Sequence, residues 1–395
     1  MLDVLIFTAS YGGGHRQAAR ALTKSLCLCR QGLRTEVADF MELISPTLNK
    51  VAWFTYIKSV RNTPSLYGYF YQVTDHIKIE PLWEKRLNYF VVQKILDFLR
   101  DRSPRLIVAT YPVAAGAISC LKEQGLVEVP LVTVITDNAV HSQWIHPCTD
   151  LYLVGSEYVR EGLICRGVPG FKIAVSGIPI DPKFARLPSR APLFEKFALT
   201  PGIAVILVMT GAAGMLRGVP SICRMLDSIS FPVQVLVVTG GDRRLYHRLQ
   251  EFARRSTKPL RVYGFVENVE EFMAVADLLI TKAGGLTTSE ALAAGLPMFI
   301  YRPIPGQEAE NTRYLAKIGA GLPVNNLQQL ETKLTLVLKE PRFLAILRER
   351  ARAAGRPEAA LTAAHIILAL AAGGYLPPLK NHVQPLLFPE VGVFY

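Results

Sequence analysis

The sequence lacks the features of an exported or membrane-spanning protein. Its two long charge-free stretches, 197–216 and 359–379, are interrupted by glycine or proline, which favours buried structure over membrane spans. The amino terminus has no basic segment or cleavage site of a signal peptide. The six cysteines among 395 residues have no zinc-ligand spacing. We therefore expect a reduced, cytoplasmic protein.

Two motifs that hold metals or phosphates are also absent. No D-x-D pair occurs, so the usual carboxylate clamp for nucleotide-bound Mg²⁺ is missing. His141 and His146 lie five residues apart without a third ligand nearby, which argues against a metal site. No Gly-Lys-Ser/Thr follows the first glycine cluster, which excludes a Walker loop. We expect neither a metal nor a cofactor.

The sequence is rich in apolar residues and positive charge. Half of its residues are hydrophobic, which allows two domains with substantial cores. Lysine and arginine number 44 against 32 acidic residues, for a formal net charge of +12. This charge implies attraction to nucleic acid, an acidic membrane surface or phosphorylated substrates, without choosing among them.

Short apolar runs alternate with helical patterns along the chain. Such runs are typical of buried parallel strands, so they predict two α/β units with doubly wound sheets. The predicted strands are 4–7, 35–38, 106–109, 131–135, 151–154 and 172–175 in the first unit, and 204–209, 233–238, 260–263, 278–281 and 298–300 in the second.

The expected domain boundary lies in a proline-rich stretch with little periodicity. We predict an N-terminal domain at 1–178, a linker at 179–202 and a C-terminal domain at 203–356. Residues 357–395 contain a helix candidate and an apolar tail, which could return to the N-terminal domain or touch a membrane.

Three glycines and a histidine separate the first predicted strand from a helix, in TASYGGGHRQAARAL. At this edge of a doubly wound sheet, Gly13 and Gly14 would let a ligand approach the backbone. His15 could take a proton from a substrate hydroxyl, or it could serve only as a cap or in a buried network. A dinucleotide site remains an alternative because Asp39 ends the second strand, although Gln17 breaks the G-x-G-x-x-G pattern.

A second catalytic candidate lies in TVITDNAVHSQWIHP. Asp137 ends a buried strand there and would face the crevice between the domains. A carboxylate in this place could orient an imidazole or receive a proton from a substrate hydroxyl. An Asx-turn at the end of the strand is the structural alternative.

The most specific stretch is TKAGGLTTSEALAAGLPMFIYRPIPGQEAEN. A helix that begins near Leu286, after a glycine turn, would direct its N–H groups and dipole at a pyrophosphate. Glu290 could accept both hydroxyls of a ribose, or it could be a solvated or dipole-matched glutamate. The side chains of Gln307, Glu308 and Asn311 suit the hydroxyls of a sugar.

Two further segments complete this candidate site. TGAAG repeats the strand-to-glycine turn, and YGFVENVEEF offers backbone groups to the edge of a base. The candidate donor-binding residues are Gly13, Gly14, Gly211, Phe265, Val266, Gly284, Gly285, Leu286, Thr287, Glu290, Gln307, Glu308 and Asn311.

Taken in order, these segments resemble those of a known enzyme family. GGGH, TDNAVHSQWIHPCTDLYLVGSE, GIPID, TGAAG, KAGGLTTSEALAAGLP and PGQEAEN are similar to segments of the diacylglycerol glucosyltransferases and monogalactosyldiacylglycerol synthases of glycosyltransferase family 28. They are more distantly similar to the murein transferase that adds GlcNAc to lipid I. The match runs from about residue 4 to residue 311. One departure is Ala283, where related glucosyltransferases often have proline.

This resemblance implies a GT-B fold, in which two Rossmann-like domains face each other across a cleft. It also implies an inverting, metal-independent transfer of a hexose, glucose or galactose, from a UDP-sugar to diacylglycerol. By position, His15 would be the base and Glu290 the ribose ligand, with Gln307 and Glu308 holding the sugar hydroxyls. Asp137 is the second catalytic candidate. A UDP-GlcNAc-type transferase, an epimerase of the same fold, and a nucleotide-sensing membrane protein are the alternatives.

Aromatic residues gather between residues 51 and 90, where ten of them make up a quarter of the stretch against 9% of the chain. Lysines and arginines between them suit the interface of an anionic bilayer. Single-stranded nucleic acid and an aromatic core are the alternatives, and the sugar-nucleotide segments favour lipid over nucleic acid. We expect peripheral binding to the inner face of the cell membrane. The candidate membrane and acceptor residues are Trp53, Phe54, Tyr56, Lys58 and Arg61.

Overall fold

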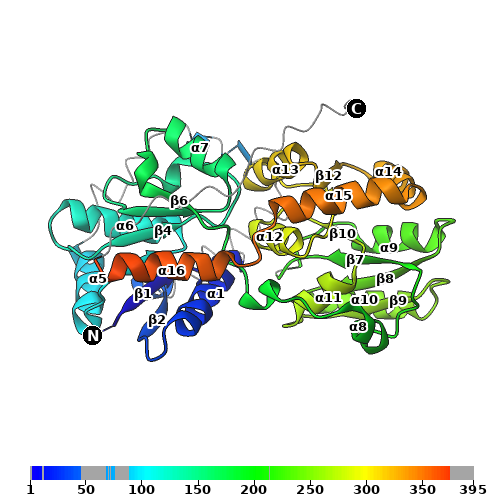
Figure 1. Cartoon of the computed structure of the whole chain (residues 1–395), viewed down its shortest axis with the longest axis horizontal. Helices are drawn as coiled ribbons and strands as arrows, with labels where there is room; N and C mark the ends of the chain where they lie inside the picture. The colour runs from blue at the N-terminus through cyan, green and yellow to red at the C-terminus, as the bar shows by residue number, and fades with distance from the viewer. Residues whose placement is uncertain are drawn as a thin grey trace.

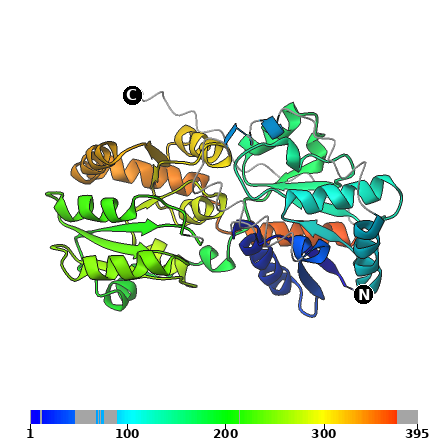
Figure 2. The same cartoon turned by 180° about the vertical axis from the view of Figure 1, so that it is seen from behind.

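Two α/β domains lie side by side in the computed structural model, each built around a parallel six-stranded sheet with helices on both faces (Figures 1 and 2). This architecture confirms the fold class predicted from the alternating apolar runs. The structure describes residues 2–10, 13–45, 68–69, 71, 73–75, 89–212 and 214–373.

The N-terminal sheet has the strand order β2-β1-β3-β4-β5-β6. Its chain runs from β1 to β2 on one side and then returns to β3 on the other, so the direction of winding reverses between β1 and β3. In open parallel sheets such a switch point is where ligands bind. The strands are β1 (Val4–Thr8), β2 (Thr35–Asp39), β3 (Ile107–Ala109), β4 (Leu131–Val134), β5 (Leu151–Val154) and β6 (Ile173–Val175).

The C-terminal sheet has the order β12-β11-β10-β7-β8-β9, and its switch point lies between β7 and β10. The sequence did not predict β12, which pairs with β11 alone at the edge of the sheet. Pro323 in this strand has no N–H to donate, and an edge strand tolerates that. The strands are β7 (Ala204–Met209), β8 (Val233–Val238), β9 (Leu260–Tyr263), β10 (Leu278–Thr281), β11 (Met298–Tyr301) and β12 (Gly321–Val324).

Helices cover both faces of each sheet (Figure 1). Those on the N-terminal sheet are α1 (Gly14–Cys29), α2 (Phe40–Ile44), α5 (Tyr89–Arg102), α6 (Pro112–Glu123), α7 (Glu157–Cys165) and α16 (Ala359–Ala371). Those of the C-terminal domain are α8 (Arg190–Lys196), α9 (Val219–Ser228), α10 (Arg243–Ala253), α11 (Val269–Val275), α12 (Gly285–Ala293), α13 (Gln307–Lys317), α14 (Leu327–Lys339) and α15 (Pro341–Ala354).

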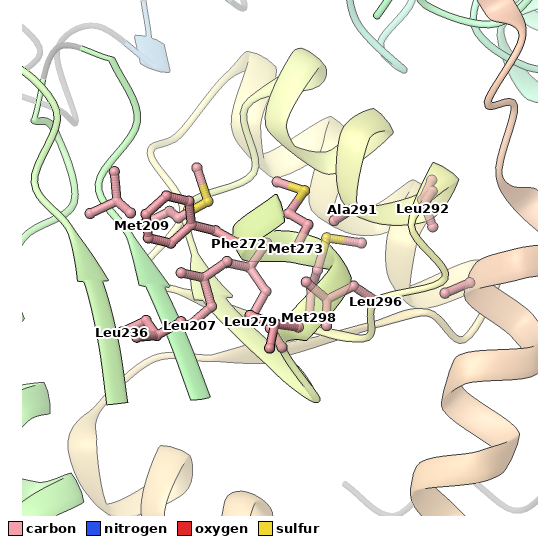
Figure 3. Packing of buried hydrophobic residues seen from close by; sticks show 14 of the residues in the cluster. Leu207, Met209, Leu236, Phe272, Met273, Leu279, Ala291, Leu292, Leu296 and Met298 are labelled. Atoms are coloured by element: carbon pink, nitrogen blue, oxygen red, sulfur yellow. The ribbon is translucent and has the colours of Figure 1, made fainter. Parts of the chain in front are cut away.

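A core cluster in the C-terminal domain fixes the position of α12 (Figure 3). Leu207 and Leu279 of the sheet pack in this cluster with Phe272 of α11 and Leu292 of α12. Full burial of a side chain of this size stabilises a fold by roughly 1.5–3 kcal/mol. The N-terminus of α12 is therefore held on a rigid support at the switch point.

Within the described residues, the chain crosses between the domains twice. Residues 179–202, expected as a linker, contain the 3₁₀ helix η3 (Pro182–Ala185) and α8, and Phe184 and Phe197 pack in the core of the C-terminal domain. Helix α16 returns to the N-terminal domain, where Ile367 packs in one cluster with Leu22 of α1. Figure 1 shows α16 beside α1.

The predicted membrane face lies outside the described residues, and so does the tail from residue 374 onward. The five residues concerned are Trp53, Phe54, Tyr56, Lys58 and Arg61. Among the helices that the structure describes, none has the length and apolar character needed to cross a bilayer.

Candidate active site

Two adjoining cavities lie between the domains, at the carboxyl ends of the strands. The smaller has a volume of about 140 Å³ and the larger about 350 Å³. They share Gln17 of α1, Gly211 after β7 and Thr287 of α12, so they form one continuous cleft. Both switch points therefore open onto the same space.

All thirteen candidate donor-binding residues line these two cavities, although they come from five separate segments of sequence. Only the larger cavity is lined by Phe265, Val266 and Glu290. His15 and Asp137, the two catalytic candidates, line the smaller one. The fold thus brings the predicted base next to the predicted sugar-binding loop.

Helix α12 begins without a side-chain cap and without an acidic residue in its first turn. Its first N–H groups and the positive end of its dipole therefore face the smaller cavity, as an anion would require. Glycine is needed at the start of this helix, since a Cβ on Gly285 would lie 2.2 Å from the carbonyl oxygen of Thr136 in the other domain.

His15 lies in the first turn of α1, with its ring held by polar and aromatic neighbours. Thr136 Oγ1 lies 2.9 Å from His15 Nδ1, and Thr110 Oγ1 donates to the carbonyl oxygen of His15. The rings of Tyr111 and Trp144 flank the imidazole at 5.5 and 6.0 Å between centroids. Burial lowers the pKa of His15 to about 4, so the imidazole is neutral at pH 7. A neutral imidazole that donates from Nδ1 keeps its Nε2 lone pair for a proton.

The sequence analysis expected Asp137 to orient an imidazole or to receive a proton. In the structure the partner of the imidazole is Thr136, and the carboxylate of Asp137 faces α13 instead. Burial raises the pKa of Asp137 to about 7, while hydrogen bonds from Asn311 and Gln307 oppose that rise. Sequence reasoning missed Thr136, whose only signal was its place beside Asp137 at the end of a strand.

Sequence reasoning also missed Lys282, which directly follows β10. Its Nζ lies 2.5 Å from Glu308 Oε1, and Glu308 Oε2 accepts a hydrogen bond from the N–H of Ile304. The side chain passes between two glycine turns, since its atoms approach Gly211 and Gly284. Among the described residues, Lys282 is the only cationic side chain lining the smaller cavity. The ammonium group of Lys282 can bind a phosphate there. It also forms an ion pair with Glu308, whose carboxylate was expected to bind a sugar.

The larger cavity is lined by Glu290 of α12 together with Phe265 and Val266. Burial raises the pKa of Glu290 to about 8, and the nearby carboxylates of Asp181 and Glu270 act in the same direction. A pair of ribose hydroxyls would supply the hydrogen bonds that this buried carboxyl group needs. The larger cavity therefore suits a nucleoside.

No group of three or more His, Cys, Asp or Glu side chains stands in a metal-binding arrangement among the residues that the structure describes. The charges that face the smaller cavity come instead from Lys282, Glu308 and Asp137.

Two family patterns and several relatives match this chain. The monogalactosyldiacylglycerol (MGDG) synthase pattern matches residues 15–180, and the glycosyltransferase family 28 C-terminal domain matches residues 205–364. The processive diacylglycerol beta-glucosyltransferase of Bacillus mycoides (strain KBAB4) is 31% identical over 385 residues, which cover 96% of this chain and 95% of the relative. That of Bacillus cereus (strain AH187) is 30% identical over 391 residues, 98% of this chain and 96% of the relative.

The chain belongs to the glycosyltransferase family of the processive diacylglycerol beta-glucosyltransferases. This confirms the family resemblance of its motifs and establishes the protein as an enzyme.

Solved structures of other glycosyltransferases and epimerases share the fold of this glycosyltransferase. MurG of Acinetobacter baumannii has a TM-score of 0.61 at 16% identity and covers 93% of this chain and 99% of its own. A complex of S. aureus MnaA with UDP has a TM-score of 0.61 at 10% identity and covers 94% of this chain and 97% of its own. These likenesses establish the GT-B fold alone.

Proposed function

We propose that this glycosyltransferase moves a hexose from a UDP-sugar to diacylglycerol with inversion, giving β-glycosyldiacylglycerol and UDP. The observation that supports it best is the arrangement of the cleft: a neutral His15 on one domain faces the N-terminus of α12 and Lys282 on the other. A base and an anion-binding site on opposite walls are what an in-line displacement at a sugar carbon requires.

In this proposal the donor lies across both cavities. The uridine occupies the larger one, with its ribose hydroxyls on Glu290 and its base against the backbone of Phe265 and Val266. The diphosphate lies at the N-terminus of α12 beside Lys282. The hexose then reaches Gln307, in the smaller cavity next to His15.

The chemical step follows from these positions. The acceptor hydroxyl gives its proton to Nε2 of His15 while its oxygen forms a bond to C1 of the hexose. The bond from C1 to the UDP oxygen breaks, and its electron pair leaves with UDP. Lys282 and the first N–H groups of α12 stabilise the charge that develops on the diphosphate. A single displacement of this kind inverts the anomeric centre.

We infer glucose as the hexose and diacylglycerol as the acceptor. The Bacillus mycoides and Bacillus cereus relatives are named processive diacylglycerol beta-glucosyltransferases, and their similarity extends along nearly the whole chain. The MGDG synthase pattern supports the same acceptor and keeps galactose as the second candidate hexose.

We also infer that the enzyme works at the inner face of the cell membrane, bound peripherally. Diacylglycerol stays in the bilayer, so the acceptor must be reached at its surface. The net charge of +12 would attract an anionic leaflet, and Trp53 and Phe54 would supply apolar contact.

A UDP-GlcNAc-type transferase or epimerase is the alternative of the same fold. The UDP-GlcNAc 2-epimerase of Neisseria meningitidis has a TM-score of 0.56 at 12% identity, which is a likeness of fold alone.

Release of UDP by the purified protein separates these functions. UDP-glucose, UDP-galactose and UDP-GlcNAc are each supplied with and without diacylglycerol vesicles. The proposal expects UDP release that depends on diacylglycerol and is fastest with UDP-glucose. Isomerisation of UDP-GlcNAc without lipid would indicate the epimerase, and the absence of lipid-dependent release with every donor would overturn the proposal.

A further inference from the structure

A three-residue loop after β4, Thr136 to Asn138, contacts both the candidate base and the donor-binding domain. On one side, Thr136 Oγ1 lies 2.9 Å from His15 Nδ1. On the other side, Asn311 of α13 binds the next two residues of the loop. The N–H of Asn138 donates to Asn311 Oδ1 at 2.8 Å, and Asn311 Nδ2 donates to Asp137 Oδ1 at 3.2 Å.

The amide of Asn311 is fully engaged by protein atoms. Its Nδ2 also donates to the carbonyl oxygen of Ala283 at 2.9 Å, so both N–H groups and the oxygen are hydrogen-bonded. The residue is 1% exposed. These contacts differ from the role expected from the sequence, in which Asn311 would bind a hydroxyl of the donor sugar.

The same loop lies directly against the first turn of α12. A Cβ on Gly285 would lie 2.2 Å from the carbonyl oxygen of Thr136 and 2.6 Å from Asp137 Oδ1. The loop therefore lies between the N-termini of α12 and α13, two helices of the donor-binding domain. In this arrangement of the two domains, these helices fix where the loop sits.

We propose that Asn311 is an interdomain positioning residue, which holds the loop from Thr136 to Asn138 in the closed cleft and so fixes the orientation of His15 through Thr136. The base is then aligned only when the donor-binding domain lies against it. The inference rests on the proposed function in one respect, the role of His15 as the base. Asn311 itself does not touch the reacting atoms.

Two substitutions remove the contact in different ways. Asn311→Ala deletes all three hydrogen bonds. Asn311→Asp is isosteric and keeps the acceptor for the N–H of Asn138, but it places a carboxyl group opposite Asp137. Thr312→Val is the matched control, because Thr312 is a buried neighbour whose hydroxyl bonds to the carbonyl oxygen of Glu308 within α13. It loses a hydrogen bond that does not cross the cleft.

Small-angle X-ray scattering and steady-state kinetics test the proposal together. For the UDP complex, Asn311→Ala should increase the radius of gyration over that of the parent, and Asn311→Asp should increase it further. The kcat should fall roughly ten- to hundredfold, as expected for a few lost hydrogen bonds, while the Kd for UDP stays within about threefold. Thr312→Val should match the parent in both measurements.

A scattering curve unchanged in both Asn311 variants overturns the proposal. Altered discrimination between UDP-glucose and UDP-galactose, with unchanged scattering, would assign Asn311 to the sugar instead. The scattering needs only UDP, so it decides the role of Asn311 even if the parent transfers no hexose to lipid. Failure of the proposed function is thus distinguishable from failure of this inference.

Discussion

The two domains use the same backbone device for different chemistry. A glycine turn leads from a buried strand at the switch point into α1 in one domain and into α12 in the other, and neither helix has a side-chain cap or an acidic first turn. Both helices thus present free N–H groups and a positive dipole end to the cleft. The difference lies in the side chains beside each turn, which are His15 in the first and Lys282 with Glu290 in the second.

Because of this difference, the two turns suit different steps of the reaction. The α1 turn offers a neutral imidazole, which can accept a proton from an incoming hydroxyl. The α12 turn offers a cation and a carboxyl group, which suit a diphosphate and a ribose. Loss of the α1 side chain should therefore affect turnover, and loss of the α12 side chains should affect binding of the donor.

The largest expected effect comes from the α1 turn. His15→Ala should lower kcat by about two to four orders of magnitude, the usual contribution of a general base, and leave the affinity for UDP nearly unchanged. Turnover is measured as diacylglycerol-dependent release of UDP, and UDP affinity by calorimetry. Arg16→Ala, an exposed neighbour on the same helix, serves as the control. Nearly normal turnover of His15→Ala would show that the base does not lie in the α1 turn.

On the α12 side, Lys282→Met should weaken binding of UDP roughly ten- to hundredfold, because a charge-assisted contact to the diphosphate is lost. The affinity for uridine, which has no phosphate, should stay the same. Lys333→Met on α14 is the matched control, since its Nζ bonds to the carbonyl oxygen of Pro323. Equal losses for UDP and uridine would show that Lys282 supports the fold of the cavity rather than the diphosphate.

Glu290→Gln should weaken binding of the donor less than Lys282→Met does. It should also stabilise the free protein relative to the parent as the pH rises. UDP binding should weaken several-fold, because an amide nitrogen replaces one of the two carboxyl oxygens that face the ribose. The pKa of Glu290 is raised from 4.5 to about 8 by burial, so between these values the folded state binds more protons than the unfolded state. The free energy of unfolding of the parent should therefore fall as the pH rises through this range.

A glutamine cannot ionise, so the Gln variant should lack this contribution. The melting temperature of Glu290→Gln minus that of the parent should increase from pH 5 to pH 9 in the absence of donor. Thermal unfolding at several pH values checks this. A difference that stays constant across that range would mean that Glu290 is hydrated in the free protein.

The smallest expected effect concerns the choice of hexose. Gln307→Ala should reduce the ratio of kcat/KM between UDP-glucose and UDP-galactose by a few-fold, because a site that loses a hydroxyl partner discriminates less. Gln329→Ala, on α14 away from the cleft, is the control. If Gln307→Ala retains the discrimination of the parent, residue 307 contributes to the turn and not to sugar recognition.

Much of the fold was predictable because its strands are buried on both faces. The run 204–209 is continuously apolar and 233–238 is interrupted only by Gln234, and this local signal does not depend on tertiary context. Strand β12 was missed because Gly321 and Pro323 obscure the pattern, and its pairing with β11 is what makes it a strand. The packing of α8 into the C-terminal core was missed for a similar reason, since its partners lie far away in sequence.

The candidate site was predictable as far as glycine turns mark it. The parts that sequence did not reveal are the contacts between segments that lie far apart. Thr136 and His15 are 121 residues apart, and Asn138 and Asn311 are 173 residues apart. No local pattern marks Thr136 as the partner of an imidazole. The sequence around Asn311 also does not distinguish an asparagine that binds a sugar from one that bonds to the other domain.

The anomeric configuration of the product is the most direct test of the roles assigned to the α1 and α12 turns. A base on the α1 side and a leaving group held on the α12 side require attack from the face opposite UDP. Proton NMR of the glycolipid formed from UDP-glucose and diacylglycerol should therefore show a β-linked glucose, from the large coupling between H1 and H2. A product with the small coupling of an α-linkage would contradict the account, because the acceptor would then have attacked from the side of the departing UDP.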